Sequence, residues 1–68
     1  MLVFVESEHN GTRAMNFRFS SERKTAAFVS DVLRLNVKAG YRGRKAAVLA
    51  PGSLATYIAD LARRHGCR

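Results

Sequence analysis

Residues 39–53 read AGYRGRKAAVLAPGS, a glycine-rich basic segment that leads into five apolar residues and then into Pro-Gly-Ser. Residues 46–50 are apolar throughout, and their length and flanking breakers predict a buried strand rather than part of a helix. Pro51-Gly52 ends that strand, and Ser53 is expected to cap a following helix. The stretch therefore predicts an α/β fold in which a basic loop lies at the entrance of a buried strand.

Two amphipathic helices are expected on either side of this stretch. The first begins at Ser20-Ser21-Glu22, where a serine oxygen caps the free N–H groups and Glu22 complements the positive end of the helix dipole. It is expected to end near Asn36, and the second helix to end at Gly66. Apolar residues recur with a 3.6-residue period in both segments. They are Phe28, Val29, Val32, Leu33 and Leu35 in the first helix and Leu54, Tyr57, Ile58, Leu61 and Ala62 in the second.

The first nineteen residues have the pattern of a β-hairpin. Residues 2–5 form a short apolar run that suits a strand covered on both faces, and Asn10-Gly11 is a tight-turn signal. Residues 12–19 then alternate, as in a half-exposed edge strand. The whole chain, residues 1–68, is thus predicted to be one small α/β (α+β) domain of order β-β-α-β-α. We expect a three-stranded mixed sheet with a right-handed crossover and with residues 2–5 or 46–50 as its central strand.

The length of the chain limits how it can be stabilised. A domain of 68 residues buries little surface and usually needs a disulfide, a metal or a partner subunit. Cys67 is the only cysteine, so no internal disulfide can form, and no His/Cys cluster offers a zinc site. Self-association, as a homodimer, is the stabilising device that is left. The sequence shows no signal peptide and no membrane span, so we expect a cytoplasmic protein with no membrane partner.

The charge balance favours an acidic ligand. Twelve Lys and Arg against five Asp and Glu give a net charge of +7, while 47% hydrophobic residues are enough for a globular core. Such an excess suits nucleic acid, an acidic protein face or an anionic membrane, and it also keeps a small protein soluble.

Few residues suggest catalysis or a cofactor. Glu6 and Glu8 share a strand face beside a turn, where exposed acids are ordinary. His65 and Cys67 are two ligands where a closed zinc site needs four. The sequence GYRGRK lacks the Walker spacing and lies between a helix and a strand. We therefore predict a protein that is not an enzyme and has no metal or cofactor.

The candidate binding site is the basic loop of residues 34–45, which contains no acid. Basic residues beside an aromatic ring can hold phosphates while the ring stacks on a base. The alternative is a solvated loop that covers the open end of the strand. The predicted binding residues are Arg34, Lys38, Tyr41, Arg42, Arg44 and Lys45, and Arg63, Arg64 and Arg68 would extend the patch if the second helix ends beside it.

The segments LVFVE, FRFSSERKTAAFVSDVLRL and YRGRKAAVLAPGSLATYIADLARRHG resemble, in order, the middle of STAS-like bacterial domains, the group that includes anti-sigma-factor antagonists. The resemblance implies a non-enzymatic regulatory module that docks on a protein partner. In the antagonists a phosphorylated serine at a helix start switches docking, and Ser20 and Ser21 lie at that place. The acidic and glycine positions of the motif are absent here, so both serines are expected to be caps.

The sequence thus predicts, first, a module that docks on an acidic protein partner and, as the alternative, a small basic protein that binds nucleic acid through residues 34–45. A loop between a helix and a strand is where a scaffold presents contacts in either case.

Overall fold

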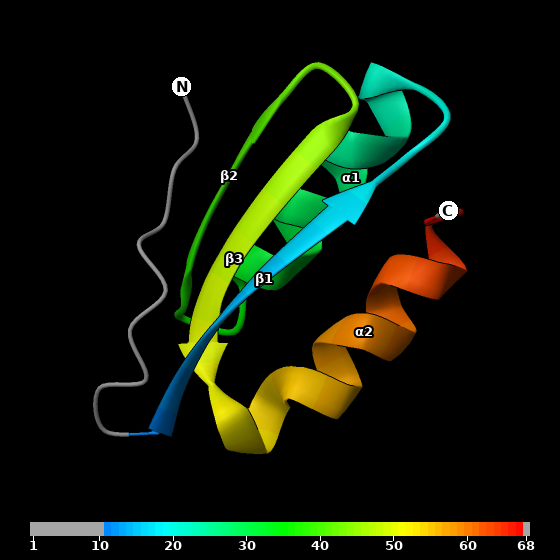
Figure 1. Cartoon of the computed structure of the whole chain (residues 1–68). Coiled ribbons are helices and arrows are strands. Elements are labelled where there is room, and N and C mark those ends of the chain that lie inside the picture. Colours follow the sequence, from blue (N-terminus) through cyan, green and yellow to red (C-terminus); the bar gives the residue numbers. More distant parts are fainter. Residues whose placement is uncertain (1–10, 68) are drawn as a thin grey trace.

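The computed structural model describes residues 11–67 as three strands and two helices (Figure 1). Strand β1 (Thr12–Arg18) is followed by helix α1 (Glu22–Leu33), strand β2 (Lys38–Arg42) and strand β3 (Lys45–Pro51). A single 3-10 turn, η2 (Gly52–Leu54), leads into helix α2 (Ala55–Arg64). The mixed α and β composition confirms the predicted fold class. The described order is β-α-β-β-α, and the strand predicted for residues 2–5 lies outside the described residues.

Strand β3 is the central strand of the described sheet. This confirms the prediction of residues 46–50 as the central strand, which was one of two alternatives. The sheet order is β1-β3-β2, and both pairings are antiparallel. The expectation of a mixed sheet with a right-handed crossover is therefore wrong for the described strands, because β1 and β3, which the crossover was expected to join in parallel, are antiparallel. β1 pairs with β3 along its whole length, from Thr12 opposite Pro51 to Arg18 opposite Lys45.

The second correction concerns residues 38–42, which the sequence suggested were part of a loop. They form β2 because a two-residue turn, Gly43-Arg44, returns the chain directly into β3. Gly43 has a φ of 60° at the first turn position. Glycine there matches the tight hairpin turn whose twist suits the flanking strands. The glycines that indicated a loop thus belong to a hairpin.

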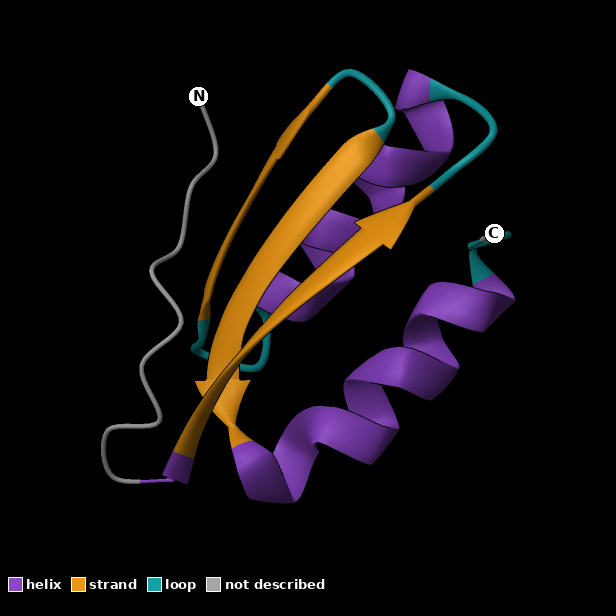
Figure 2. Ribbon diagram, in the orientation of Figure 1, coloured by secondary structure: helices purple, strands orange, loops and turns teal. Residues whose placement is uncertain are grey.

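Both helices contribute to one core on one face of the sheet (Figure 2). Phe28 of α1 is fully buried, and its ring centroid lies 5.2 Å from that of Phe17 and 5.1 Å from that of Phe19. Ile58 and Ala62 of α2 are fully buried in the same cluster. Most residues of the predicted apolar stripes are buried or partly buried. Leu35 and Leu54 pack against the core from outside the two helices, and Leu33 and Tyr57 are 50% and 49% exposed because each lies at the margin of its buried helix face.

The capping residues predicted from the sequence account for some, but not all, of the observed helix ends. Ser21 caps α1, since its Oγ accepts a hydrogen bond from the backbone N–H of Lys24 at 3.2 Å. The helix ends earlier than expected, at Leu33, and Asn36 adopts a left-handed φ of 63° beyond it. Ser53 does not cap α2 because it lies inside η2, and Leu54 takes the cap position without a side-chain bond. Gly66, with a φ of 86°, follows α2 as predicted.

Candidate anion-binding site

The sheet presents two chemically different faces, which the alternation of β3 defines. Ala46, Val48 and Ala50 belong to the buried core under the helices. Successive side chains of a strand point to opposite faces, so Lys45, Ala47 and Leu49 point to the second face. No helix of residues 11–67 covers that face, although Ala47 is buried there at 2% exposure, whereas Lys45 is exposed. The residues of β1 and β2 that pair with Lys45 or Leu49 lie on this same face.

Three cations form a row across the second face at one end of the sheet. Arg18 of β1 and Arg42 of β2 both lie in register with Lys45 of β3. Neighbouring strands are about 4.8 Å apart, so the backbones of the two arginines are separated by about 10 Å with the lysine between them. All three residues are exposed. We call Arg18, Lys45 and Arg42 the cation row.

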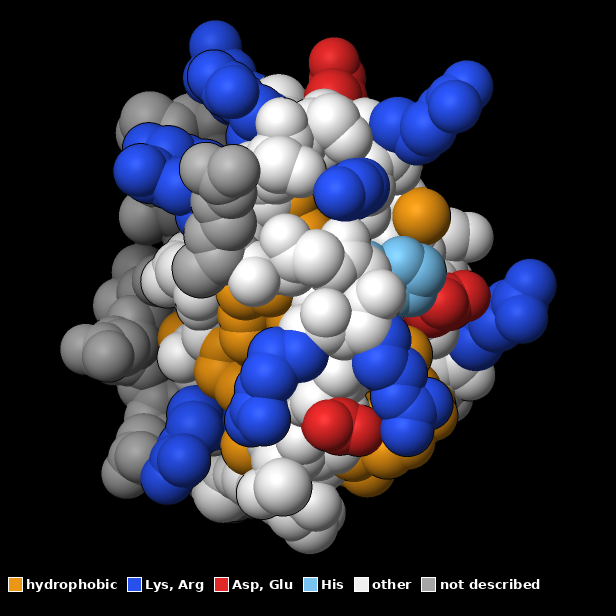
Figure 3. Space-filling model, turned by 90° about the vertical axis from the view of Figure 1, so that its right-hand side faces the viewer, with side chains coloured by type: hydrophobic (Ala, Val, Ile, Leu, Met, Phe, Trp, Pro, Cys, Tyr) orange, Lys and Arg blue, Asp and Glu red, His pale blue; other side chains and the backbone are white. Residues whose placement is uncertain are grey.

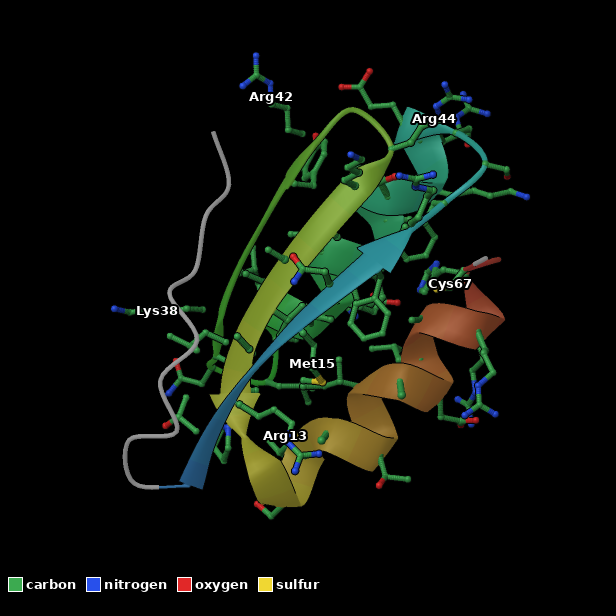
Figure 4. All side chains as sticks on the ribbon, viewed as in Figure 1. Arg13, Met15, Lys38, Arg42, Arg44 and Cys67 are labelled. Carbon is green, nitrogen blue, oxygen red and sulfur yellow. The ribbon has the colours of Figure 1, made fainter. Side chains whose placement is uncertain are left out.

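The turn between β2 and β3 adds a fourth cation to this end of the sheet. Arg44 follows Gly43 in the turn, and its carbonyl oxygen accepts a hydrogen bond of 2.8 Å from the N–H of Phe19. Figure 4 shows Arg42 and Arg44 extending in different directions from the same turn. A hollow of about 680 Å³ at this end is lined by the cation row, Arg44 and Ser20, among others.

No carboxylate neutralises this cluster within the described part of the chain. The close contacts between basic and acidic side chains there join Arg64 to Asp60 at 3.2 Å and the imidazole Nε2 of His65 to Asp31 at 2.7 Å, and neither includes a cation of the hollow. Lys and Arg side chains also project from many points on the side of the molecule shown in Figure 3, where acidic side chains are sparse. The site can therefore attract an anion without first breaking an internal ion pair.

The structure divides the residues predicted for the basic loop. Arg42, Arg44 and Lys45 come together at the turn. Lys38 lies at the other end of β2, about 13 Å away along the strand. Arg34 caps the far end of α1. The structure therefore does not bring the six predicted residues of the basic loop together, because β2 is extended and carries the two ends of the segment apart.

Tyr41 lies beside the cluster rather than in it. It is in register with Ala46, so it points to the helix face of the sheet, and it is 40% exposed at the sheet edge. Sequence reasoning missed Arg18, which belongs to the cluster. The alternation of residues 12–19 had placed Arg18 on the exposed face, but only the register of β1 on β3 puts it beside Lys45.

The remaining predicted site residues have different surroundings. Ser20 lines the hollow, whereas the Oγ of Ser21 is engaged as the helix cap. Arg63 and Arg64 are in the last turn of α2, which ends near the β1 end that carries Arg18 (Figure 1). They do not line the hollow. Arg68 lies outside the described residues.

The C-terminal residues hold the helices together. Besides its contact with Asp31, the imidazole ring of His65 lies 6.2 Å from the ring of Phe28. Cys67 forms an isolated antiparallel bridge with Phe19. Residues 11–67 contain no group of three or more potential metal ligands. Neither helix in that range is long and apolar enough to cross a bilayer.

Comparisons of this chain with protein-family models, with curated proteins and with solved structures find no match.

Proposed function

We propose that this protein binds nucleic acid through phosphate contacts at the cation row and Arg44. The observation that carries the proposal is the cation row, in which three exposed cations lie in register across three strands. No carboxylate of residues 11–67 lies within ion-pair distance of them. Nucleic acid is a polyanion of the intracellular compartment, and the proposal accordingly places the protein in the cytoplasm.

Repulsion between the charges of the cation row lowers the stability of the folded protein. Like charges directly opposite each other on neighbouring strands destabilise a sheet. Lys45 has such a neighbour on both sides. A phosphate bound between the side chains would remove this repulsion, and arginine offers phosphate a planar, bidentate donor. The charge pattern is thus unfavourable in the free protein and favourable in a complex with a polyanion.

Salt-dependent binding tests the proposal. Fluorescence anisotropy of labelled single-stranded and duplex oligonucleotides is titrated with the protein between about 50 and 200 mM salt. Each phosphate neutralised contributes about −0.7 to the slope of log affinity against log salt for a single strand, so four cations predict a slope of about −3.

Two matched double variants locate the contacts. Replacing Arg42 and Arg44 by glutamine should make the slope of log affinity against log salt less steep by about 1.4, which is the contribution of two phosphate contacts. Replacing Arg13 and Arg34 by glutamine removes the same charge from exposed positions away from the hollow and should leave the slope unchanged. An equal change of slope in the two double variants would show that only net charge determines the binding. Absence of binding by the wild-type protein at low salt would exclude the proposed function.

Docking on an acidic protein is the second candidate, and the STAS-like resemblance supports it. The observation that favours it is Tyr41, which is 40% exposed one residue before Arg42. Tyrosine and arginine, with tryptophan, are enriched among the residues that contribute most to the binding energy of protein interfaces. Under this alternative Tyr41→Ala would abolish capture of the partner, whereas it would leave the salt slope for oligonucleotides unchanged. Self-association of the small chain, tested by sedimentation, is compatible with either candidate.

A further inference from the structure

A second, smaller hollow adjoins the first on the sheet. Its volume is about 390 Å³, and it shares Arg18 and Lys45 with the larger hollow. Phe17 and Ala46 pair with each other and direct their side chains toward the helices, so they contribute a floor of paired backbone. The fifth residue that lines this hollow is Asn16.

Asn16 brings a different chemistry to this hollow. It lies two residues before Arg18 on β1, and therefore on the same face of the sheet. Asn16 is exposed, and its side-chain amide forms no hydrogen bond with any described residue. An amide offers two donors and one carbonyl acceptor in a plane. That pattern complements the N6 and N7 edge of adenine.

The geometry points to a ligand that places an anion and a hydrogen-bonding group side by side. Resting on the proposed function, we propose that the bound nucleic acid is single-stranded, with a phosphate in the larger hollow and the adjoining base in the smaller one. Asn16 reads the edge of that base and prefers adenine. Arg18 and Lys45, the shared wall, hold the backbone between the two.

The dimensions of the site favour a single strand over a duplex. The major groove is about 12 Å wide and admits one helix or a two-stranded ribbon. Here the phosphate-binding row spans three strands, and the sheet is backed by two helices. A base that lies on the strand backbone beside its own phosphate must be unpaired and splayed from its neighbours, as single-stranded segments allow.

The test compares labelled oligo(dA), oligo(dT) and oligo(dC) of about ten nucleotides, a length within the range of single-strand sites. At fixed salt, the wild-type protein should bind oligo(dA) roughly tenfold more tightly than oligo(dT), which is within what one bidentate contact supplies. Asn16→Ala should lower the affinity for oligo(dA) to that for oligo(dT), with the salt slope unchanged. Asn16→Gln, which keeps the amide, should retain part of the preference.

Thr12→Ala is the matched control, because Thr12 lies on the same face of β1 but outside both hollows. It should preserve the preference for oligo(dA). Circular dichroism establishes that each variant is folded. Equal affinity of the wild-type protein for the three oligonucleotides would overturn the inference while salt-dependent binding still supported the proposed function. Duplex binding as tight as that of oligo(dA) would likewise overturn it. Absence of salt-dependent binding to any oligonucleotide would overturn both.

Discussion

Replacing Lys45 by glutamine should stabilise the fold and weaken nucleic-acid binding at the same time. Lys45 lies between Arg18 and Arg42 in the cation row, so its ammonium group is repelled from both sides. Glutamine has a similar length and no charge. The substitution therefore removes two repulsive cross-strand pairs without removing a buried contact, since Lys45 is exposed.

The size of the gain follows from the spacing of the strands. Opposite Cβ atoms are about 5 Å apart, and flexible side chains can spread their charged ends to about 8 Å. Two unit charges at about 8 Å in water repel by about 0.5 kcal/mol, so two pairs amount to about 1 kcal/mol. Screening at physiological salt, where the Debye length is also about 8 Å, reduces this to about 0.4 kcal/mol.

Thermal unfolding followed by circular dichroism measures the effect. At low salt the melting temperature of Lys45→Gln should exceed that of the wild-type protein by about 4–8 °C, and the difference should shrink by more than half at physiological salt. Lys38→Gln is the control. Lys38 is also exposed on the second face, but its register partner on β3 is Leu49, so its removal relieves no such repulsion.

Two results would refute this reasoning. One is an unchanged or lower melting temperature for Lys45→Gln at low salt. The other is an equal increase for Lys38→Gln, which would mean that net charge, rather than the row, opposes folding. Weaker oligonucleotide binding by Lys45→Gln together with a higher melting temperature would show that the row is maintained at a cost in stability.

Three further substitutions test the fold. Phe28→Ala should cost about 3–5 kcal/mol and leave the chain largely unfolded, because the ring is fully buried against two other rings; a cooperative urea transition near that of the wild-type protein would contradict this. Ser21→Ala should cost about 1 kcal/mol in urea unfolding through loss of the α1 cap, and no change would mean that water replaces the Oγ. Gly43→Ala should lower the free energy of unfolding by about 1–2 kcal/mol because of its positive φ alone, since an added Cβ meets nothing within 4 Å. Gly43→Asn should lower it by less, and equal thermal stability of both variants and the wild-type protein would argue against the hairpin turn.

The elements with strong periodicity could be predicted from the sequence. Residues 46–50 are apolar in succession, and the stripes through Phe28 and Ile58 recur with the helical period, so burial of one face was evident locally. The strand at residues 38–42 was not evident, because it is short and Gly40 and Gly43 suggested a loop. Whether glycine marks a loop or a hairpin turn depends on the strand that the chain returns to.

The candidate site was predictable only in part. The concentration of charge at Arg42, Arg44 and Lys45 follows from their adjacency in the chain. Arg18 and Asn16 are remote from them in sequence, and nothing local distinguishes them from other exposed polar residues of an edge strand.

Local interactions along the chain thus decide where helices and strands form and which of their faces is apolar, because those preferences depend on residues three or four positions apart in helices and two apart in strands. The register of β2 on β3 is set locally, by a two-residue turn between paired residues no more than eleven positions apart. The register of β1 on β3 instead depends on contacts between residues 27 to 39 positions apart, which become favourable only when the whole core closes. Register is what sets Arg18 and Arg42 on either side of Lys45. A shift of one residue in β1 would turn Arg18 toward the helices, so the tertiary structure decides that Arg18 joins the three cations that lie close together in the sequence.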